Sequence, residues 1–375
     1  MARILIIGGG FGGVVAAESL ARKLGSEHEI TLVSRSRKFL FYPALVRFAF
    51  GHYQVEDISF DLREALLDRR IRFVEGEIAR INDYKRHVTF AHGDVVGEMP
   101  YDFLVLALGR RLATERVTGF FEHAHHLLGL DAALKFGDTV QSFHQGHAVI
   151  GHCPGARLPI PVFETAFALS RLLEQRGERD RCAITIVSNQ TPDEMFGGAA
   201  VSEALRDVLN SHQVEFMSNF AINEVTPSSV IANDGRKLDC NLRMLVPPFR
   251  GPGVMLGKEI TNDEGYLRVD TTMRVSNIER TYAVGDCVNF QGPKLGHMAI
   301  RQGEVAAENL TAEIQGRALS AVYDHGMMLV IDAAGQDSIF VRKDLWTDDP
   351  TKIELGKFWS WAKRMDKRYW KAKHG

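Results

Sequence analysis

Three glycines near the start of the chain have the spacing of a phosphate-binding loop. Gly8, Gly10 and Gly13 follow the apolar run Ile4–Ile7, which is typical of a buried strand. In this pattern the first glycine permits a tight turn, the second lets the backbone approach a pyrophosphate, and the third allows close helix–strand packing. The following helix directs its N-terminal N–H groups at the phosphate charge. The spacing therefore predicts a dinucleotide site.

A second segment keeps the outline of this motif but not its chemistry. IGHCPGARLPIPVFE retains Gly151 and Gly155, yet Pro159 and Pro161 stand where a helix would present free N–H groups to a pyrophosphate. Proline has no N–H donor and a fixed φ. We therefore expect the second site not to bind NAD.

The elements that surround both loops are those of βαβ units. Residues 1–33 read as strand, glycine turn, helix and strand, and a similar series begins near His147. The segments TYAVGDC and HMAIRQGEVAAENL read as a strand and a helix that return to the first unit. We predict an α/β fold with two Rossmann-like, three-layer domains of the dinucleotide-binding type, the second inserted in the first, and a C-terminal amphipathic helical tail.

The predicted boundaries follow from these elements. They are 1–112 with 278–322 for the first domain, 113–277 for the second, and 323–375 for a C-terminal module.

Composition narrows the class of protein. The chain has 375 residues, 45% hydrophobic and 25% charged, with a net charge of −2, so no general attraction to nucleic acid is expected. It has no apolar run of 18 residues and no N-terminal signal-peptide pattern. The four cysteines are widely separated, which excludes a zinc ribbon and argues against a disulfide scaffold. The histidines between residues 123 and 152 have no metal-ligand spacing, and no metal site is predicted.

The C-terminal segment 357–373 has seven Lys or Arg residues against one acid and three of the four tryptophans. Six residues share one predicted helical face: Phe358, Trp361, Ala362, Met365, Tyr369 and Trp370. Aromatic and basic residues on an amphipathic helix favour the surface of a membrane. The alternative is a helix packed on the protein itself or at a homo-oligomer interface.

Two further segments, YDFLVLALGRR and TYAVGDCVNF, resemble the paired signatures of flavoproteins with two dinucleotide-binding domains. The resemblance implies FAD at the first site, with Asp286 on the ribityl chain and Gly285 giving backbone access. It also implies that Ala107 and Gly109 line the FAD cleft. The second strand ends at Ser34 and Arg35 instead of an acid. Arg35 alone would suggest a 2′-phosphate; with FAD, Ser34 is expected to bind the adenosine ribose.

Within these flavoproteins the chain resembles the sulfide:quinone oxidoreductase and flavocytochrome c sulfide dehydrogenase family along its length. The segments are KFLFYPALVRFAFG, HCPGA and GPKLGHMAIRQGEVAAENL. The resemblance implies that Pro43 lies beside the isoalloxazine and Cys153 near the flavin. It also places Lys294, Gly296, His297 and Met298 at the flavin pyrimidine and quinone end. A positive Lys294 there would stabilise anionic reduced flavin.

The chain departs from this family in its cysteines. The resemblance implies a second redox cysteine near Leu329 and a third near HAHHLLGL, and both are absent. A two-thiol relay cannot run with Cys153 alone. Three interpretations of Cys153 remain: it attacks the flavin, it carries a single persulfide, or it is an inert buried thiol.

His152 and His297 flank the expected flavin. Either is a candidate proton relay to reduced quinone, and simple hydrogen bonding is the alternative for both. Glu164 is a weaker acid–base candidate, since a carboxylate at a helix start is favoured by the helix dipole.

The resemblance and these departures lead to one functional prediction. We expect an FAD-dependent oxidoreductase that passes electrons from a small sulfur donor, sulfide or persulfide, to membrane quinone. It would be a peripheral, monotopic protein on the cytoplasmic side of the cell membrane, bound through residues 357–373. The alternatives are a type II NADH:quinone dehydrogenase and a non-catalytic flavin-bound protein recruited to the membrane.

Overall fold

The computed structural model describes residues 1–92, 95–252, 260–335 and 338–375. Two parallel sheets dominate it. The first has the order β19-β9-β1-β2-β5 and the second the order β13-β12-β11-β17. The strands of the first sheet are β1 (Arg3–Ile7), β2 (Glu29–Ser34), β5 (Arg72–Glu75), β9 (Phe103–Leu106) and β19 (Thr281–Ala283). Those of the second are β11 (Gly146–His152), β12 (Cys182–Ser188), β13 (Glu215–Met217) and β17 (Leu242–Val246).

Each sheet has a helix directly after its central strand, as the sequence predicts. The helix α1 (Phe11–Leu24) follows β1, and α7 (Ile160–Arg176) follows β11. Gly177 ends α7 in a left-handed conformation with φ 68°, which glycine adopts without strain. These two units confirm the predicted α/β class with two dinucleotide-binding-type folds.

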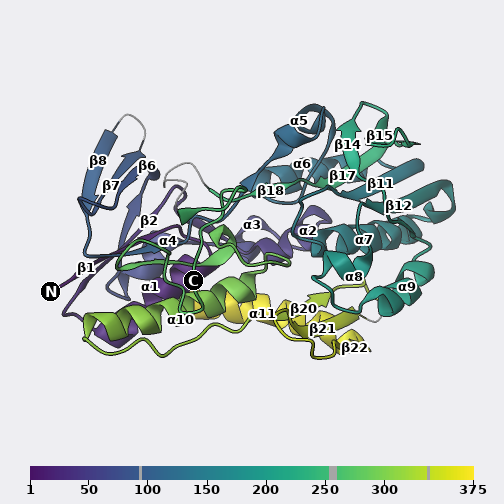
Figure 1. Cartoon of the computed structure of the whole chain (residues 1–375). Coiled ribbons are helices and arrows are strands. Elements are labelled where there is room, and N and C mark those ends of the chain that lie inside the picture. Colours follow the sequence, from purple (N-terminus) through teal and green to yellow (C-terminus); the bar gives the residue numbers. More distant parts are fainter. Residues whose placement is uncertain (93–94, 253–259, 336–337) are drawn as a thin grey trace.

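The chain returns to the first sheet after residue 280. Thr281 pairs with Leu104 in parallel register, so β19 lies next to β9. The helix α10 (Gly296–Ile314) then packs along α1 (Figure 1). This return brings the ends of β1, β9 and β19 to one sheet edge.

Smaller antiparallel sheets and helices complete the fold. Two of the sheets have two strands: β3 (Lys38–Leu40) pairs with β4 (Ser59–Asp61), and β10 (Arg111–Leu112) pairs with β18 (Phe249–Arg250). The other sheets have three strands each. They are formed by β6 (Glu77–Asn82), β7 (His87–His92) and β8 (Val95–Pro100); by β14 (Ile222–Val225), β15 (Ser229–Ala232) and β16 (Lys237–Asp239); and by β20 (Gly326–Ile331), β21 (Ser338–Asp344) and β22 (Lys352–Gly356). The remaining helices before the tail are α2 (Leu45–Ala49), α3 (Val55–Ile58), α4 (Leu62–Leu67), α5 (Phe120–His123), α6 (Leu130–Gln141), α8 (Pro192–Met195) and α9 (Ser202–Ser211).

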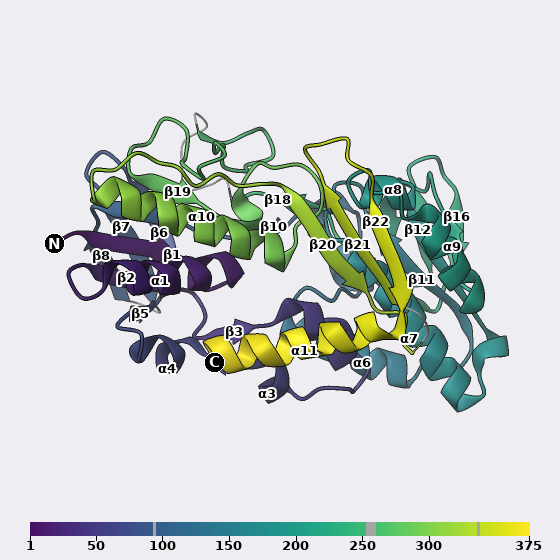
Figure 2. The same ribbon diagram turned by 90° about the horizontal axis from the view of Figure 1, so that it is seen from below.

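The chain ends in a long helix, α11 (Lys357–His374), as predicted. It starts at the β20–β22 sheet and runs back to the first domain (Figure 2). There Arg69, which follows α4, donates a hydrogen bond to the His374 carbonyl oxygen at 3.3 Å. The tail therefore packs along the body of the molecule.

Candidate active site

The N-terminal glycine loop has the geometry of a phosphate cradle. Gly8 has φ +115°, and a Cβ there would fall 2.0 Å from the Ala107 carbonyl oxygen, so only glycine fits. At Gly10 an added Cβ would meet no atom within 4 Å. Gly10 is also the N-cap of α1, which has no side-chain cap and no acid in its first turn. The open loop and the positive end of α1 fit a pyrophosphate.

The residues predicted to flank an adenosine and a flavin lie around this loop. Ser34 ends β2, and its Oγ would be 2.8 Å from a Cβ on Gly9, so its hydroxyl borders the loop. Arg35 is exposed. Pro43 lies in a short 3₁₀ turn, Tyr42–Ala44, and is also exposed. The placement of Ser34 is compatible with its predicted contact to a ribose.

Asp286 lies directly after β19 at the same sheet edge. Gly285, with φ +82°, donates its backbone N–H to Gln302 Oε1 at 2.7 Å, which fixes the turn that presents Asp286. The Asp286 carboxylate forms an ion pair with Arg110, the residue after Gly109. The Arg110 guanidinium also lies 4.4 Å from the centroid of the Phe249 ring. Sequence reasoning did not single out Arg110, although it stands next to a predicted cleft residue.

Lys294 is part of a row of charges that the sequence did not reveal. Its Nζ donates to the Val288 carbonyl oxygen at 2.6 Å and lies 4.9 Å from the Tyr266 ring centroid. On the same ring, the Arg157 guanidinium lies 5.3 Å from the centroid. Burial, reinforced by the charge of Arg157, lowers the pKa of Lys294 to about 7. Burial therefore disfavours the positive charge that the sequence led us to expect on Lys294, and the predicted role of Lys294 at the flavin stays a prediction.

Tyr266 was missed altogether, because it lies in a stretch without a motif. Its side chain is buried, and its hydroxyl has no hydrogen-bond partner among the described residues. Burial raises the pKa of this phenol, so the hydroxyl is a proton donor at neutral pH.

The first turn of α10 carries the other residues predicted at the flavin end. Met298 is buried and shares a small cavity with Asp286 and Lys294. Gly296 faces the Phe11 ring, 3.2 Å from an added Cβ. His297 Nε2 accepts a hydrogen bond from the Met328 backbone N–H at 3.0 Å, and burial lowers its pKa. His297 thus anchors β20, and its predicted proton-relay role stays a prediction.

His152 and Cys153 lie on opposite sides of the second sheet. His152 pairs in register with Ser188 and Val246. It is 1% exposed, and both ring nitrogens lack a partner among the described residues. Burial lowers the pKa of His152 to about 3, so its ring is neutral.

Cys153 turns its side chain into an apolar cluster with Val149, Val187 and Leu245. It is fully buried, and burial raises the pKa of its thiol well above the usual range. A neutral thiol is a poor nucleophile. In this conformation the thiol is enclosed and protonated, and the choice among the three interpretations of Cys153 stays a prediction.

No described cysteine lies in position to pair with Cys153. All four cysteines are buried and free. Leu329, the expected place of a second redox cysteine, lies in β20 opposite Val341 and is buried. The structure thus places a core residue there.

Glu164 is neither an exposed acid nor a simple helix-start carboxylate. It is 4% exposed and forms an ion pair with Lys363 of α11. Its Oε1 also accepts the Asp332 backbone N–H at 2.7 Å. Burial raises the pKa of Glu164, and Lys363 opposes that shift. Its contacts make it a structural anchor for the tail helix.

Four of the six residues predicted on one face of the tail helix are exposed, whereas Ala362 is half-buried and Trp370 is buried. We call Phe358, Trp361, Met365 and Tyr369 the tail face; their exposed fractions are 62, 49, 37 and 62%. Trp370 is 6% exposed instead, with its ring 4.8 Å from that of Phe11 and 5.6 Å from that of Phe39. The assignment of Trp370 to the exposed face was therefore wrong, because the first domain offers an aromatic pocket that covers it. Among the described residues, no helix is long and apolar enough to cross a membrane.

Comparison with known proteins identifies the family to which this chain is similar. The family model of the pyridine nucleotide-disulphide oxidoreductases matches residues 2–303. The sulfide-quinone reductase of Aquifex aeolicus is 25% identical over 99% of this chain and 91% of its own. A type II NADH:quinone oxidoreductase of Haemophilus influenzae is 24% identical over 86% of this chain and 82% of its own.

A solved structure shows the same fold. The crystal structure of the sulfide:quinone oxidoreductase from Aquifex aeolicus superposes with a TM-score of 0.93. It covers all of this chain and 92% of that chain, at 23% identity.

Proposed function

This chain belongs to the pyridine nucleotide-disulphide oxidoreductase family, and from that membership we propose that it is an FAD-dependent enzyme that transfers electrons from a small sulfur donor to a quinone. Family membership makes it an oxidoreductase. The cofactor, the donor and the acceptor are the proposal, and each rests on its own observations.

The first sheet edge supports FAD. The open cradle at Gly10 and the free positive end of α1 suit the pyrophosphate. Asp286 and Arg110, now paired with each other, would separate to bind a polar chain between them. Lys294 and Met298 border the same region. Bound FAD would accept an electron pair from the donor and give it up to the acceptor.

The second sheet edge argues against a nicotinamide nucleotide. Pro159 is the N-cap of α7 and Pro161 stands in its first turn. These two positions offer no N–H to a phosphate. Gly151 is required by the packing of the core, because a Cβ there would lie 2.4 Å from the Leu245 side chain and 2.6 Å from the Ile222 side chain. This contrast between the two sheet edges is the observation that carries the proposal.

A sulfur donor and a quinone are favoured by the similarity to sulfide-quinone reductases over nearly the whole chain. The tail face suits the interfacial region of a membrane, where quinones are reached. We therefore propose a peripheral membrane location, with the tail face as the contact.

The type II NADH:quinone oxidoreductase reading has one observation in its favour, the similarity over 86% of this chain. It requires a nicotinamide nucleotide to bind at the start of α7, where the prolines stand. Both readings share flavin and quinone, so the electron donor distinguishes them.

Anaerobic rapid mixing of the flavin-loaded protein tests the proposal. We expect sulfide to bleach the flavin absorbance within seconds, decylubiquinone to restore it, and NADH to leave it unchanged. Bleaching by NADH alone would establish the alternative donor. Reduction by neither donor would leave a flavin-bound protein without turnover. Cys153→Ala, with Cys182→Ala as the matched buried-cysteine control, then shows whether Cys153 takes part.

A further inference from the structure

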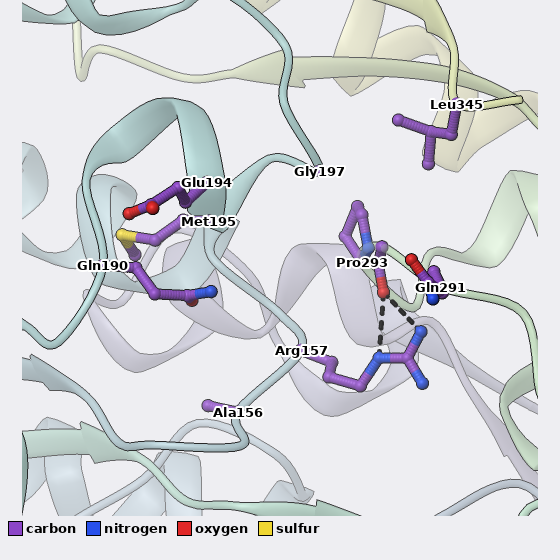
Figure 3. A pocket seen from close by; sticks show the side chains of 10 residues that line it. Ala156, Arg157, Gln190, Glu194, Met195, Gly197, Gln291, Pro293 and Leu345 are labelled. Carbon is purple, nitrogen blue, oxygen red and sulfur yellow. Dashed lines mark hydrogen bonds between the residues drawn. The ribbon is translucent and has the colours of Figure 1, made fainter. Parts of the chain in front are cut away.

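The C-terminal residues 323–375 reach the carboxyl edges of both parallel sheets. At the second sheet Leu345, which follows β21, lines a cavity of about 290 Å³ together with Arg157 and Gln190 (Figure 3). At the first sheet the contact is direct. The last turn of α11 lies beside β3 (Figure 2), and the Trp370 ring lies 4.8 Å from the ring of Phe11 in the glycine loop. This second contact bears on the cofactor.

Phe11 carries the only side chain of the glycine loop. Residues 8–13 read GGGFGG, and Phe11 is the first residue of α1, directly after the N-cap Gly10. Its backbone N–H is therefore among the free donors at the start of the helix that suit a pyrophosphate. Glycine loses more backbone freedom than any other residue when a loop is ordered. The contacts of the Phe11 ring are consequently the side-chain contacts that can hold these donors in place.

Three aromatic rings surround the Phe11 ring. The ring centroids of Phe39, Phe41 and Trp370 lie 5.1, 5.6 and 4.8 Å from it, so Trp370 is the nearest. Phe39 and Phe41 follow β2 in the chain, whereas Trp370 comes from the C-terminal end. Trp370 is buried, and its Nε1 has no hydrogen-bond partner among the described residues. Packing alone therefore holds the indole against Phe11.

A polar contact fixes the same turn of the tail to α1. His374 Nδ1 lies 2.6 Å from Oε2 of Glu18, and Arg69 Nη1 lies 3.4 Å from Oε1 of the same carboxylate. Glu18 follows Phe11 by seven residues, which places both on one face of α1. The last turn of α11 is thus docked along α1 from the residue that opens the phosphate site.

We propose that Trp370 is a positioning residue for the cofactor: through the Phe11 ring it holds the first turn of α1 in the conformation that binds a pyrophosphate. The proposal rests on the proposed FAD site at this loop. A loop that is already held in place binds its ligand without the cost of ordering it. Coupling between two sites is reciprocal, so docking of the tail and binding of flavin strengthen each other.

The rate of flavin release from the loaded protein tests this role. After dilution, the fluorescence of free flavin should rise at least about tenfold faster for Trp370→Ala than for the wild type. Trp370→Phe keeps an aromatic ring and loses no described hydrogen bond, so it should stay within about threefold of the wild type. Trp359→Ala is the matched control, because Trp359 stacks on Phe340, with ring centroids 4.1 Å apart, at the other end of α11. It should also stay within about threefold.

Two results of this experiment would overturn the proposal. Release from Trp370→Ala at the wild-type rate would show that the ring does not support the loop. Release from Trp359→Ala as fast as from Trp370→Ala would show a general effect of loosening the tail helix.

The wild type supplies a second measurement, which holds even if Trp370→Ala fails to fold. Because the coupling is reciprocal, bound flavin must suppress opening of the last turn of the tail. Hydrogen exchange of residues 367–374 should be at least about tenfold slower in the flavin-loaded protein than in the flavin-free protein. Exchange in α9, at the opposite end of the molecule (Figure 1), should not change. Equal exchange of residues 367–374 in the two forms overturns the coupling.

Failure of the proposed function gives a different result. Purified protein that retains no flavin, or a Gly10→Ala variant that retains all of it, refutes the cofactor site and the positioning role with it. If flavin is lost in Gly10→Ala but is released at the same rate by the wild type and Trp370→Ala, the cofactor site stands and only the positioning role is refuted.

Discussion

Lys363 and Glu164 form a buried ion pair that joins the tail helix to the second domain across 199 residues of sequence. Their side chains are 17 and 4% exposed. Next to them Arg47 Nη1 donates to Asp332 Oδ2 at 2.8 Å, and Ser360 Oγ donates to Asp332 Oδ1 at 3.1 Å. This cluster ties together α2, α7, α11 and the turn after β20.

We predict that Lys363→Ala destabilises the protein by about 3–5 kcal/mol, because it leaves Glu164 buried without its partner. Urea unfolding followed by tryptophan fluorescence measures the change. The double variant with Glu164→Gln should recover part of the loss, and Lys357→Ala, at an exposed lysine of the same helix, should cost little. A loss in Lys363→Ala no larger than that in Lys357→Ala contradicts the role of the pair.

The phosphate cradle can be closed without disturbing the fold. At Gly10 φ is −85° and an added methyl group meets no atom within 4 Å, so Gly10→Ala should fold normally. Its methyl group would stand where the pyrophosphate approaches. We expect the purified variant to lose most of its flavin absorbance while its circular dichroism is unchanged. Gly129→Ala, at another N-cap with open space around it, should retain flavin. Full flavin content in Gly10→Ala would place the cofactor elsewhere.

The buried amine of Lys294 makes stability depend on pH. Its pKa is about 7 in the folded, flavin-free chain, against 10.5 when unperturbed. Between these values the unfolded chain binds a proton that the folded chain has released, so stability rises with pH. The protonated amine is unfavourable in the fold below pH 7, and this penalty disappears as pH rises toward 10.5.

In flavin-free protein, we therefore expect the unfolding free energy of the wild type, relative to Lys294→Met, to increase by up to about 1.4 kcal/mol per pH unit above pH 7. Urea titrations from pH 6 to 9.5 measure it. Lys135→Met, at an exposed lysine of α6, should show no such trend. A difference that is flat across this range would mean that Lys294 stays charged when buried.

The sequence predicts the parts of the site that are encoded locally. Gly8, Gly10 and Gly13 stand between a β-strand and an α-helix within a few residues, and the backbone angles at Gly8 require glycine. Asp286 was found only by resemblance to other proteins, and the structure brings it to the sheet edge through the pairing of β19 with β9.

Contacts between distant segments escaped prediction. Helical periodicity predicted an apolar face on the tail helix, but it could not show that Phe11 and Phe39 cover Trp370. In the sequence Lys363 looks like an ordinary solvent-exposed lysine, and only the structure shows that it forms an ion pair with Glu164 of α7. Tyr266 carries no motif, and its importance appears only when Arg157 and Lys294 are seen on its ring. In each case the partner lies too far along the chain for any pattern to indicate it.

Because Cys153 is buried, we predict that it resists alkylation in the folded protein. Because the thiol is neutral and fully buried, iodoacetamide at pH 8 should leave it unmodified in the oxidised folded protein. Mass spectrometry should then find alkylation at Cys153 only after unfolding in urea. Rapid modification of the folded protein would show that Cys153 opens to solvent. The reading of Cys153 as a persulfide carrier would then gain support.

The tail helix offers two tryptophans with opposite surroundings. Trp361 belongs to the exposed tail face, whereas Trp370 is buried against Phe11 and Phe39. Trp361→Ala should leave stability within about 0.5 kcal/mol and weaken binding to liposomes of mixed neutral and anionic lipid several-fold, because an interfacial aromatic anchor is lost. Trp370→Ala should cost about 3–5 kcal/mol, as for other buried aromatic side chains. Sedimentation with liposomes and urea unfolding separate the two effects. If Trp361→Ala binds liposomes as wild type does, the tail face is not the membrane contact, and the helix serves only contacts within the protein.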